Sequence, residues 1–171
     1  MALRTILLHP DPALRLRAAE VERFDGELAA LVRDLAETMY AAPGVGLAAP
    51  QVGVSRRVAV VDVHAGEADS RLHVLVNPRI LEAQGKSLET EGCLSIPGFT
   101  EKVERPERVR IAARNERGEA FELEAEGLLG RALCHEIDHL DGVLFIDRIT
   151  GLRRELAKRR LRKLGYGERP R

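Results

Sequence analysis

One ten-residue stretch, residues 133–142 (Leu-Cys-His-Glu-Ile-Asp-His-Leu-Asp-Gly), constrains this chain more than any other. His135 and His139 are four residues apart, which on an α-helix places them about 40° apart around the axis, so both imidazoles can reach one metal ion. Glu136 lies on the same broad face and can handle the proton of a water molecule on that metal without being a ligand. The pattern predicts a helix that carries part of a catalytic metal site. The alternative is a solvent-exposed helix that has His, Glu and His at this spacing by chance.

Two histidines do not complete such a site, so a third ligand must come from elsewhere in the chain. In the pattern HExxHxxGxxH the third histidine position falls on Phe145, which cannot bind a metal. A downstream carboxylate, Glu155, would make the protein a zinc endopeptidase. Upstream, Cys93 is the best soft ligand, in a loop expected over residues 89–98, although a small buried thiol is the commoner role for a single cysteine.

The length of 171 residues fits one domain over residues 1–171, and the expected helices and strands make its fold class α+β. We expect antiparallel or mixed β-sheets packed around a central HExxH helix, with N-terminal helices and a C-terminal helix. The expected helices cover residues 12–15 (capped by Asp11), 25–42, 127–142 and 152–164. The expected strands cover residues 57–63, 73–83, 109–114 and 120–125, with an irregular loop over 44–53 and a flexible tail over 165–171.

The composition excludes several classes of protein. No run of eighteen apolar residues is present, and the N-terminus lacks the pattern of a secretory signal, so we expect a cytoplasmic protein with no membrane partner. The only two cysteines, Cys93 and Cys134, argue against a disulfide framework, and packing is the expected role of Cys134.

The charge is zero overall but unevenly distributed. From Arg148 onward ten basic residues face two acidic ones, Glu155 and Glu168, which leaves the rest of the chain acidic. A basic segment on an acidic body indicates an anionic partner for that segment.

Three segments together resemble the motifs of peptide deformylases. Residues 44–51 (Gly-Val-Gly-Leu-Ala-Ala-Pro-Gln) match GxGLAAxQ, residues 91–95 (Glu-Gly-Cys-Leu-Ser) match EGCLS, and residues 135–142 match HExDHLxG. The opening at residues 10–15 is also similar, so the resemblance covers nearly the whole chain. Arg131, one turn before His135, occupies a position that is often apolar in the family, which indicates a difference in the substrate pocket.

The resemblance implies a metal-dependent hydrolase that removes the formyl group from N-formylmethionyl peptides and releases formate. Cys93, His135 and His139 would then be the metal ligands, with Glu136 as general base and acid for the attacking metal-bound water. The Gln51 amide and the Leu94 backbone N–H would stabilise the oxyanion. The expected substrate-binding residues are Gly44, Val45, Gly46, Leu128 and Ala132.

The resemblance also implies a cofactor and partners. One divalent metal per chain is expected, Fe²⁺ in cells, while Zn²⁺, Ni²⁺ or Co²⁺ suit the same ligands. The substrates would be nascent N-formylmethionyl chains, and the basic C-terminal helix would dock a monomeric enzyme on ribosomal RNA near the exit tunnel. A non-catalytic RNA-binding module with a structural metal is a further alternative, which predicts that Glu136 is dispensable.

Overall fold

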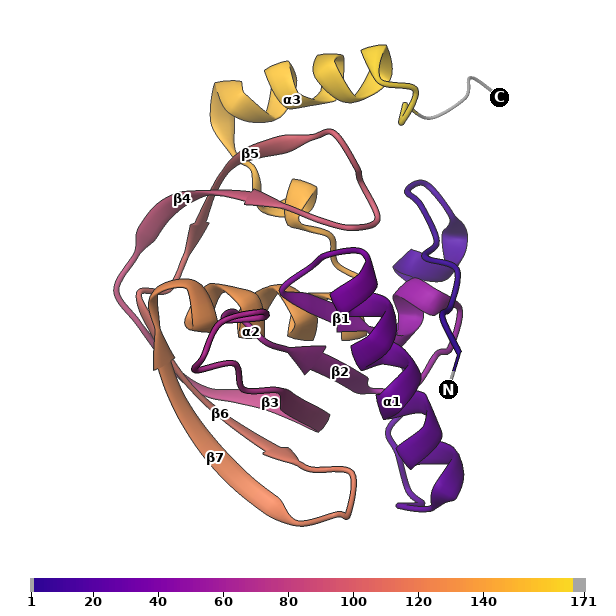
Figure 1. Cartoon of the computed structure of the whole chain (residues 1–171). Helices are drawn as coiled ribbons and strands as arrows, with labels where there is room; N and C mark the ends of the chain where they lie inside the picture. Colours follow the sequence, from indigo (N-terminus) through magenta and orange to yellow (C-terminus); the bar gives the residue numbers. More distant parts are fainter. Residues whose placement is uncertain (1, 168–171) are drawn as a thin grey trace.

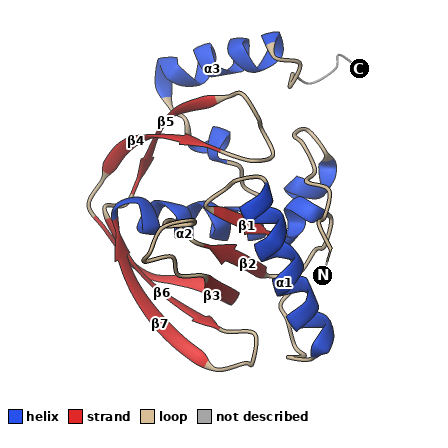
Figure 2. Ribbon diagram, viewed as in Figure 1, coloured by secondary structure: helices blue, strands red, loops and turns tan. Residues whose placement is uncertain are grey.

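The computed structural model describes residues 2–167 and has the expected α+β architecture (Figure 2). Five strands form one antiparallel sheet in the spatial order β1-β2-β3-β6-β7, and β4 and β5 pair as a separate two-stranded sheet. The strands are β1 (Gly46–Ala48), β2 (Val58–Val61), β3 (His73–Gln84), β4 (Ser87–Gly92), β5 (Thr100–Arg105), β6 (Arg108–Arg114) and β7 (Ala120–Glu126).

A single helix, α2, lies between the five-stranded sheet and the β4–β5 hairpin (Figure 1). The helices are α1 (Gly26–Ala41), α2 (Gly127–Leu140), α3 (Gly151–Lys163) and the short 3-10 helices η1 (Pro12–Arg15), η2 (Ala49–Val52) and η3 (Phe145–Arg148). Asp141 caps α2, and Gly142 follows with a φ of +75°, a backbone conformation that glycine adopts without strain. None of the helices described within residues 2–167 has the length and apolar character needed to cross a bilayer.

Strand β2 explains how α2 is held in place. All four of its residues are buried, because alternate side chains enter different hydrophobic clusters on the two faces of the sheet. Ala59 and Val61 belong to the cluster with residues of α2, whereas Val58 and Val60 belong to the cluster with residues of α1. The sheet thus fixes one side of α2, and the opposite side faces the β4–β5 hairpin (Figure 1).

Two expected loops are partly regular structure, so those two predictions were wrong in detail. Within residues 44–53 the chain forms strand β1, which pairs with β2, and then η2. Within residues 89–98 the first part belongs to β4, which pairs with β5. The sequence does not predict β1 and β4, because neither strand has the alternation of apolar and polar residues that usually indicates a strand. Backbone pairing with the neighbouring strand holds each of them in place.

The C-terminal helix α3 packs against the hairpin side of the molecule. Ala157 and Leu161 are buried in a cluster with Ile96 and Phe99. The expected tail is ordered at its start, because Tyr166 donates a hydrogen bond of 2.7 Å from its hydroxyl to the Pro97 carbonyl. The remainder of that predicted tail, residues 168–171, lies outside the described residues.

Candidate metal centre and active site

Helix α2 brings the two histidines together. Residues 130–140 are all buried, and the Nε2 atoms of His135 and His139 are 3.1 Å apart. The Phe145 ring, at the position where the longer motif has a histidine, lies at 25° to the His135 ring with 6.1 Å between centroids. Phe145 therefore packs against the site instead of ligating within it.

The hairpin supplies the third group. Cys93 follows β4, and its Sγ lies 3.3 Å from His139 Nε2. The candidate ligand atoms of Cys93, His135 and His139 all lie within 4.8 Å of one another. Ligands around a tetrahedral ion with bonds of about 2.0–2.3 Å are about 3.3–3.7 Å apart, so these residues fit one metal ion. Glu155 belongs to no such group and instead lies exposed on α3, 3.6 Å from Lys158.

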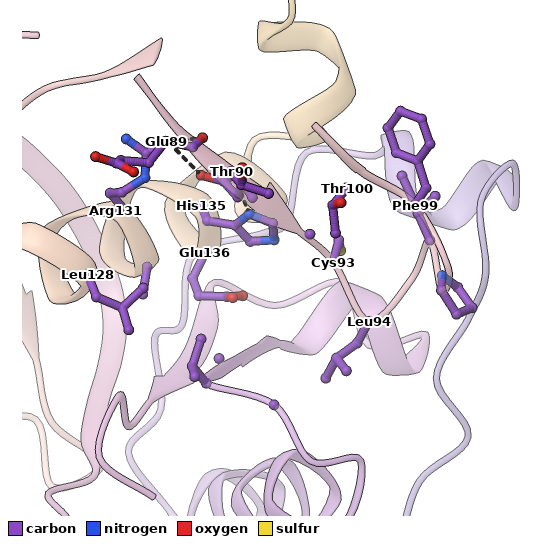
Figure 3. Close-up of a pocket in the computed structure, with 18 of the residues that line it drawn as sticks. Glu89, Thr90, Cys93, Leu94, Phe99, Thr100, Leu128, Arg131, His135 and Glu136 are labelled. Atoms are coloured by element: carbon purple, nitrogen blue, oxygen red, sulfur yellow. Dashed lines mark hydrogen bonds and ion pairs between the residues drawn. The ribbon is translucent and has the colours of Figure 1, made fainter. Parts of the chain in front are cut away.

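Glu136 extends from α2 into the same space. Figure 3 shows its carboxylate between His135 and Leu94. The side chain is buried, and its Oε2 has no hydrogen-bond partner within residues 2–167. Burial raises the pKa of Glu136 to about 7, although the charge of His135 opposes the shift. A carboxyl with a pKa in this range can both take up and release a proton near neutral pH.

Charge on the two histidines differs. Burial lowers the pKa of His139 well below its ordinary value, so its imidazole is neutral, as a metal ligand must be. Burial acts in the same direction on His135, but hydrogen bonds with Cys93 and Glu91 outweigh it and raise the pKa well above the ordinary value. A metal ion that bound His135 would therefore displace a proton from its ring.

The other two predicted catalytic groups lie beside the cluster. Gln51 is buried, its Oε1 accepts a hydrogen bond from the Ala48 N–H at 2.9 Å, and its Nε2 donates to Ser95 Oγ at 3.1 Å. The same Nε2 is 3.6 Å from Cys93 Sγ, so the amide points its N–H groups toward the metal side. The Leu94 N–H, one residue after Cys93, makes no hydrogen bond within residues 2–167.

A cavity of about 710 Å³ opens onto these groups. Figure 3 shows Leu128 and Arg131 at one end of it, Phe99 at the other, and His135, Glu136 and Cys93 between them. All the predicted substrate-binding residues line this cavity: Gly44, Val45, Gly46, Leu128 and Ala132. His139 lies behind the lining, so the cavity reaches the cluster from the side of Cys93 and His135.

The comparisons with known proteins agree with this geometry. The model of the polypeptide deformylase family matches residues 3–155, and a peptide deformylase of Acidobacterium capsulatum is 51% identical over 164 residues, 96% of each chain. The chain belongs to the polypeptide deformylase family. The crystal structure of the Legionella pneumophila deformylase has a TM-score of 0.88 at 46% identity, covering 96% of both chains. That of the Synechococcus elongatus deformylase, in complex with actinonin, has a TM-score of 0.90 at 41% identity, covering 96% of this chain and 89% of that one.

Family membership confirms the expected activity. As a peptide deformylase, the chain is a hydrolase that removes the N-terminal formyl group from newly made polypeptides. The family depends on a metal, and the cluster of Cys93, His135 and His139 is a candidate site for it.

This deformylase also has a charged network around the site that the sequence did not reveal. Glu91 Oε2 is 2.8 Å from His135 Nδ1, on the opposite side of the ring from the candidate ligand atom. Arg105 binds both Glu91 and Asp138, with distances of 2.6 Å to each, and Asp138 also binds Arg148. Although burial opposes charge on Glu91, hydrogen bonds from His135 and Arg105 lower its pKa to about 2.

Replacing Glu91 with glutamine is expected to weaken metal binding by about 10–100-fold, because a carboxylate that holds a ligating histidine fixes both its orientation and its basicity. Competition with a chromophoric chelator measures the affinity. Glu104→Gln is the matched control, since Glu104 is exposed on β5 and pairs only with Lys86 within residues 2–167. Equal affinities for Glu91→Gln and the unaltered protein would contradict the role of Glu91.

Gly46 is required by the position of Glu136. A Cβ built on Gly46 would lie 2.9 Å from Glu136 Cδ and closer still to Oε1. Gly46→Ala is expected to displace the carboxylate and lower kcat/KM for a formylmethionyl peptide by about 100-fold, the cost of a displacement of about 1 Å at a reacting group. Gly26→Ala is the control, because a Cβ there meets nothing within 4 Å. An active Gly46→Ala protein would show that Glu136 has room to move.

Proposed function

We propose that Cys93, His135 and His139 hold one divalent metal ion with which this deformylase hydrolyses N-formylmethionyl peptides. The observation that carries the proposal is the convergence of three ligand atoms within 4.8 Å beside a cavity that also exposes Glu136. A divalent ion at this site supplies a Lewis acid that lowers the pKa of a water molecule and polarises the formyl carbonyl. The remaining chemistry belongs to the side chains of this protein.

Glu136 is the proposed proton carrier. Its carboxylate faces the cavity and has an oxygen with no partner within residues 2–167, so it is available to accept the proton of the attacking water. As the C–N bond of the formamide breaks, the same carboxyl gives that proton to the nitrogen of the departing peptide amine. The products are formate and a peptide with a free amino terminus.

Gln51 and Leu94 are the proposed donors to the formyl oxygen. Negative charge develops on that oxygen as water adds to the formyl carbon. The Gln51 amide is held in advance by Ala48 and Ser95, so its Nε2 does not need to reorient when the charge appears. The Leu94 N–H has no competing acceptor within residues 2–167, and donors placed in this way typically contribute about 3–4 kcal/mol each.

The cavity accounts for recognition of the substrate. We assign the methionine side chain to the end lined by Val45, Leu128 and Ala132. Strand β1 is at the edge of its sheet, so the peptide backbone can pair beside Gly44 and Gly46 as an added strand. Small residues suit this edge, because larger side chains would obstruct the pairing.

The proposed metal in the cell is Fe²⁺. One thiolate and two imidazoles also accept Zn²⁺, Ni²⁺ and Co²⁺, and the order of affinities alone does not select among them. Support for iron comes from the general behaviour of the family. Metal analysis of protein purified without oxygen, compared with protein purified in air, tests the assignment.

Formate release from a formylmethionyl tripeptide by metal-loaded protein tests the function itself. We expect turnover that disappears on chelation and returns when the metal is restored. An unformylated peptide in a parallel reaction tests the endopeptidase alternative, which requires cleavage of that peptide. Absence of formate from fully loaded protein would overturn the proposal.

We also propose that α3 docks on ribosomal RNA. Besides Arg160, six basic residues are exposed on this helix: Arg153, Arg154, Lys158, Arg159, Arg162 and Lys163. Arg160, expected to join them, instead binds Glu101 at 3.0 Å and lies over the Phe99 ring, so it supports the fold. Truncation of the whole helix would remove this support, and replacement of the six exposed residues by serine is the cleaner test. Co-sedimentation with ribosomes should fall, most clearly at low salt, and unchanged binding would contradict docking.

The proposed enzyme acts as a cytoplasmic monomer. Nascent chains with a formylated terminus are its substrates, and every group in the proposed mechanism comes from one chain. Light scattering coupled to gel filtration measures the mass in solution.

A further inference from the structure

Arg131 is a charged residue that lines the cavity, and within residues 2–167 it reaches the groups of the proposed mechanism only through an ion pair of 3.5 Å with Glu91. Arg131 belongs to α2 and is buried. Its guanidinium donates hydrogen bonds to three backbone carbonyls of the β4–β5 hairpin. The acceptors are Ser87 at 3.1 Å, Glu89 at 3.1 Å and Val103 at 2.6 Å. In Figure 3 Arg131 lies beside Leu128, at the end of the cavity assigned to the methionine side chain.

A second cavity lies on the other side of Arg131. It has a volume of about 350 Å³ and is lined by Ser87, Pro106, Glu107, Glu126, Gly127 and Arg131. Three of these residues, Ser87, Gly127 and Arg131, also line the first cavity. The hydrogen bond from Arg131 Nη1 to the Ser87 carbonyl therefore lies at the boundary between the two spaces.

We propose that Arg131 determines substrate specificity by closing the deep end of the pocket for the first side chain of the substrate. This inference rests on the proposed function, because it assumes that this end of the cavity receives that side chain. An unbranched side chain of the length of methionine fits in front of the guanidinium. A longer one must displace Arg131 before it can continue into the second cavity.

The boundary is rigid for two reasons. Arg131 comes from a helix segment, residues 130–140, in which every residue is buried, and its guanidinium is held by carbonyls of both β4 and β5. Moving it aside would leave several buried hydrogen bonds unmade, which is costly inside a protein. Side-chain length is therefore limited by a fixed group and not by a flexible one.

The test uses formyl peptides whose first residue is methionine or carries an unbranched side chain of four, six or eight carbons. In the unaltered protein kcat/KM should fall sharply at eight carbons. Arg131→Ala removes the side chain that separates the two cavities. Each methylene of the substrate side chain that becomes buried in the opened space should raise kcat/KM about fourfold. The ratio of kcat/KM for the eight-carbon substrate to that for methionine should rise at least about tenfold.

Two further variants separate pocket depth from loosening of the hairpin. Arg131→Met loses the hydrogen bonds to the hairpin but still fills the space between the two cavities with an unbranched side chain. The ratio of kcat/KM for the eight-carbon substrate to that for methionine should therefore stay within about twofold of the ratio in the unaltered protein, which is less than the effect of burying one methylene. Arg110→Ala removes an arginine from the outer face of the sheet, where it pairs with Glu82 and Glu122, and should leave the ratio unchanged.

The outcomes are distinct. An unaltered protein that accepts eight carbons as well as methionine, an unchanged ratio in Arg131→Ala, or an equal rise in Arg131→Met would each overturn the inference while leaving deformylation intact. A metal-loaded protein that releases no formate from any of these peptides would instead overturn the proposed function.

Discussion

Replacing Glu136 with glutamine is expected to lower kcat/KM for a formylmethionyl peptide by about 10²–10⁴-fold, the usual contribution of a positioned general base. Glutamine has nearly the same shape but cannot accept a proton from water. Glu136 is buried and contacts the cavity without belonging to the three-residue cluster, so the protein should keep its full complement of metal. Formate release and metal content measured on the same sample test both statements.

The combination of lost activity and retained metal is what identifies a proton carrier. Loss of metal together with activity would mean that Glu136 supports the site structurally. Full activity in Glu136→Gln would contradict its role in proton transfer and would favour the alternative in which the metal is only structural. Glu124→Gln, an exposed change on β7, controls for the loss of one carboxylate.

Replacing Cys93 with alanine is expected to weaken metal binding by more than about 100-fold. Loss of a residue that only hydrogen-bonds to a metal ligand already costs about 10–100-fold in affinity, and Cys93 is itself a candidate ligand. The two histidines remain but offer only two ligands, which is one fewer than a catalytic site of this type uses. Activity should fall in proportion to the bound metal. Equilibrium dialysis followed by elemental analysis measures the loss.

Cys134→Ala is the matched control, because the chain contains only these two cysteines. Cys134 is next to His135 in sequence, yet it is packed in the hydrophobic cluster between α2 and the sheet. Burial raises the pKa of its thiol to about 11, so it is not a thiolate at neutral pH. Cys134→Ala should retain metal, and equal metal loss in both variants would show that thiol reactivity in general, and not ligation by Cys93, explains the result.

The parts of the site that follow from short-range spacing could be predicted from the sequence. His135, Glu136 and His139 lie on one helix, so their relative positions depend only on helix geometry. The α+β class and the central helix also followed from local patterns. The resemblance of three segments to the family's motifs connects that helix with Gln51 and the Cys93 loop.

The parts that depend on pairing between distant segments could not be predicted. Glu91 is inside one of the recognised motifs, but its partner Arg105 is 14 residues away and lies opposite Ser87 in the register of β4 and β5, so strand pairing alone does not predict their contact. Those strands are rich in charged and polar residues, a composition that the sequence alone does not distinguish from a solvated loop. Tyr166 likewise falls in the predicted tail, because its contact with Pro97 requires α3 to lie against the hairpin.

The candidate ligands come from two different layers, and this has a consequence for folding. Cys93 belongs to the β4–β5 hairpin and His139 to α2, 46 residues later in the chain. A metal bound to both closes a chain loop of that length, as a disulfide would, and in a chain-entropy model such a closure stabilises the folded state by about 4 kcal/mol. The affinity for the metal therefore includes the free energy of ordering the hairpin on the helix. A substitution that loosens the hairpin far from the ligands will accordingly appear as weaker metal binding.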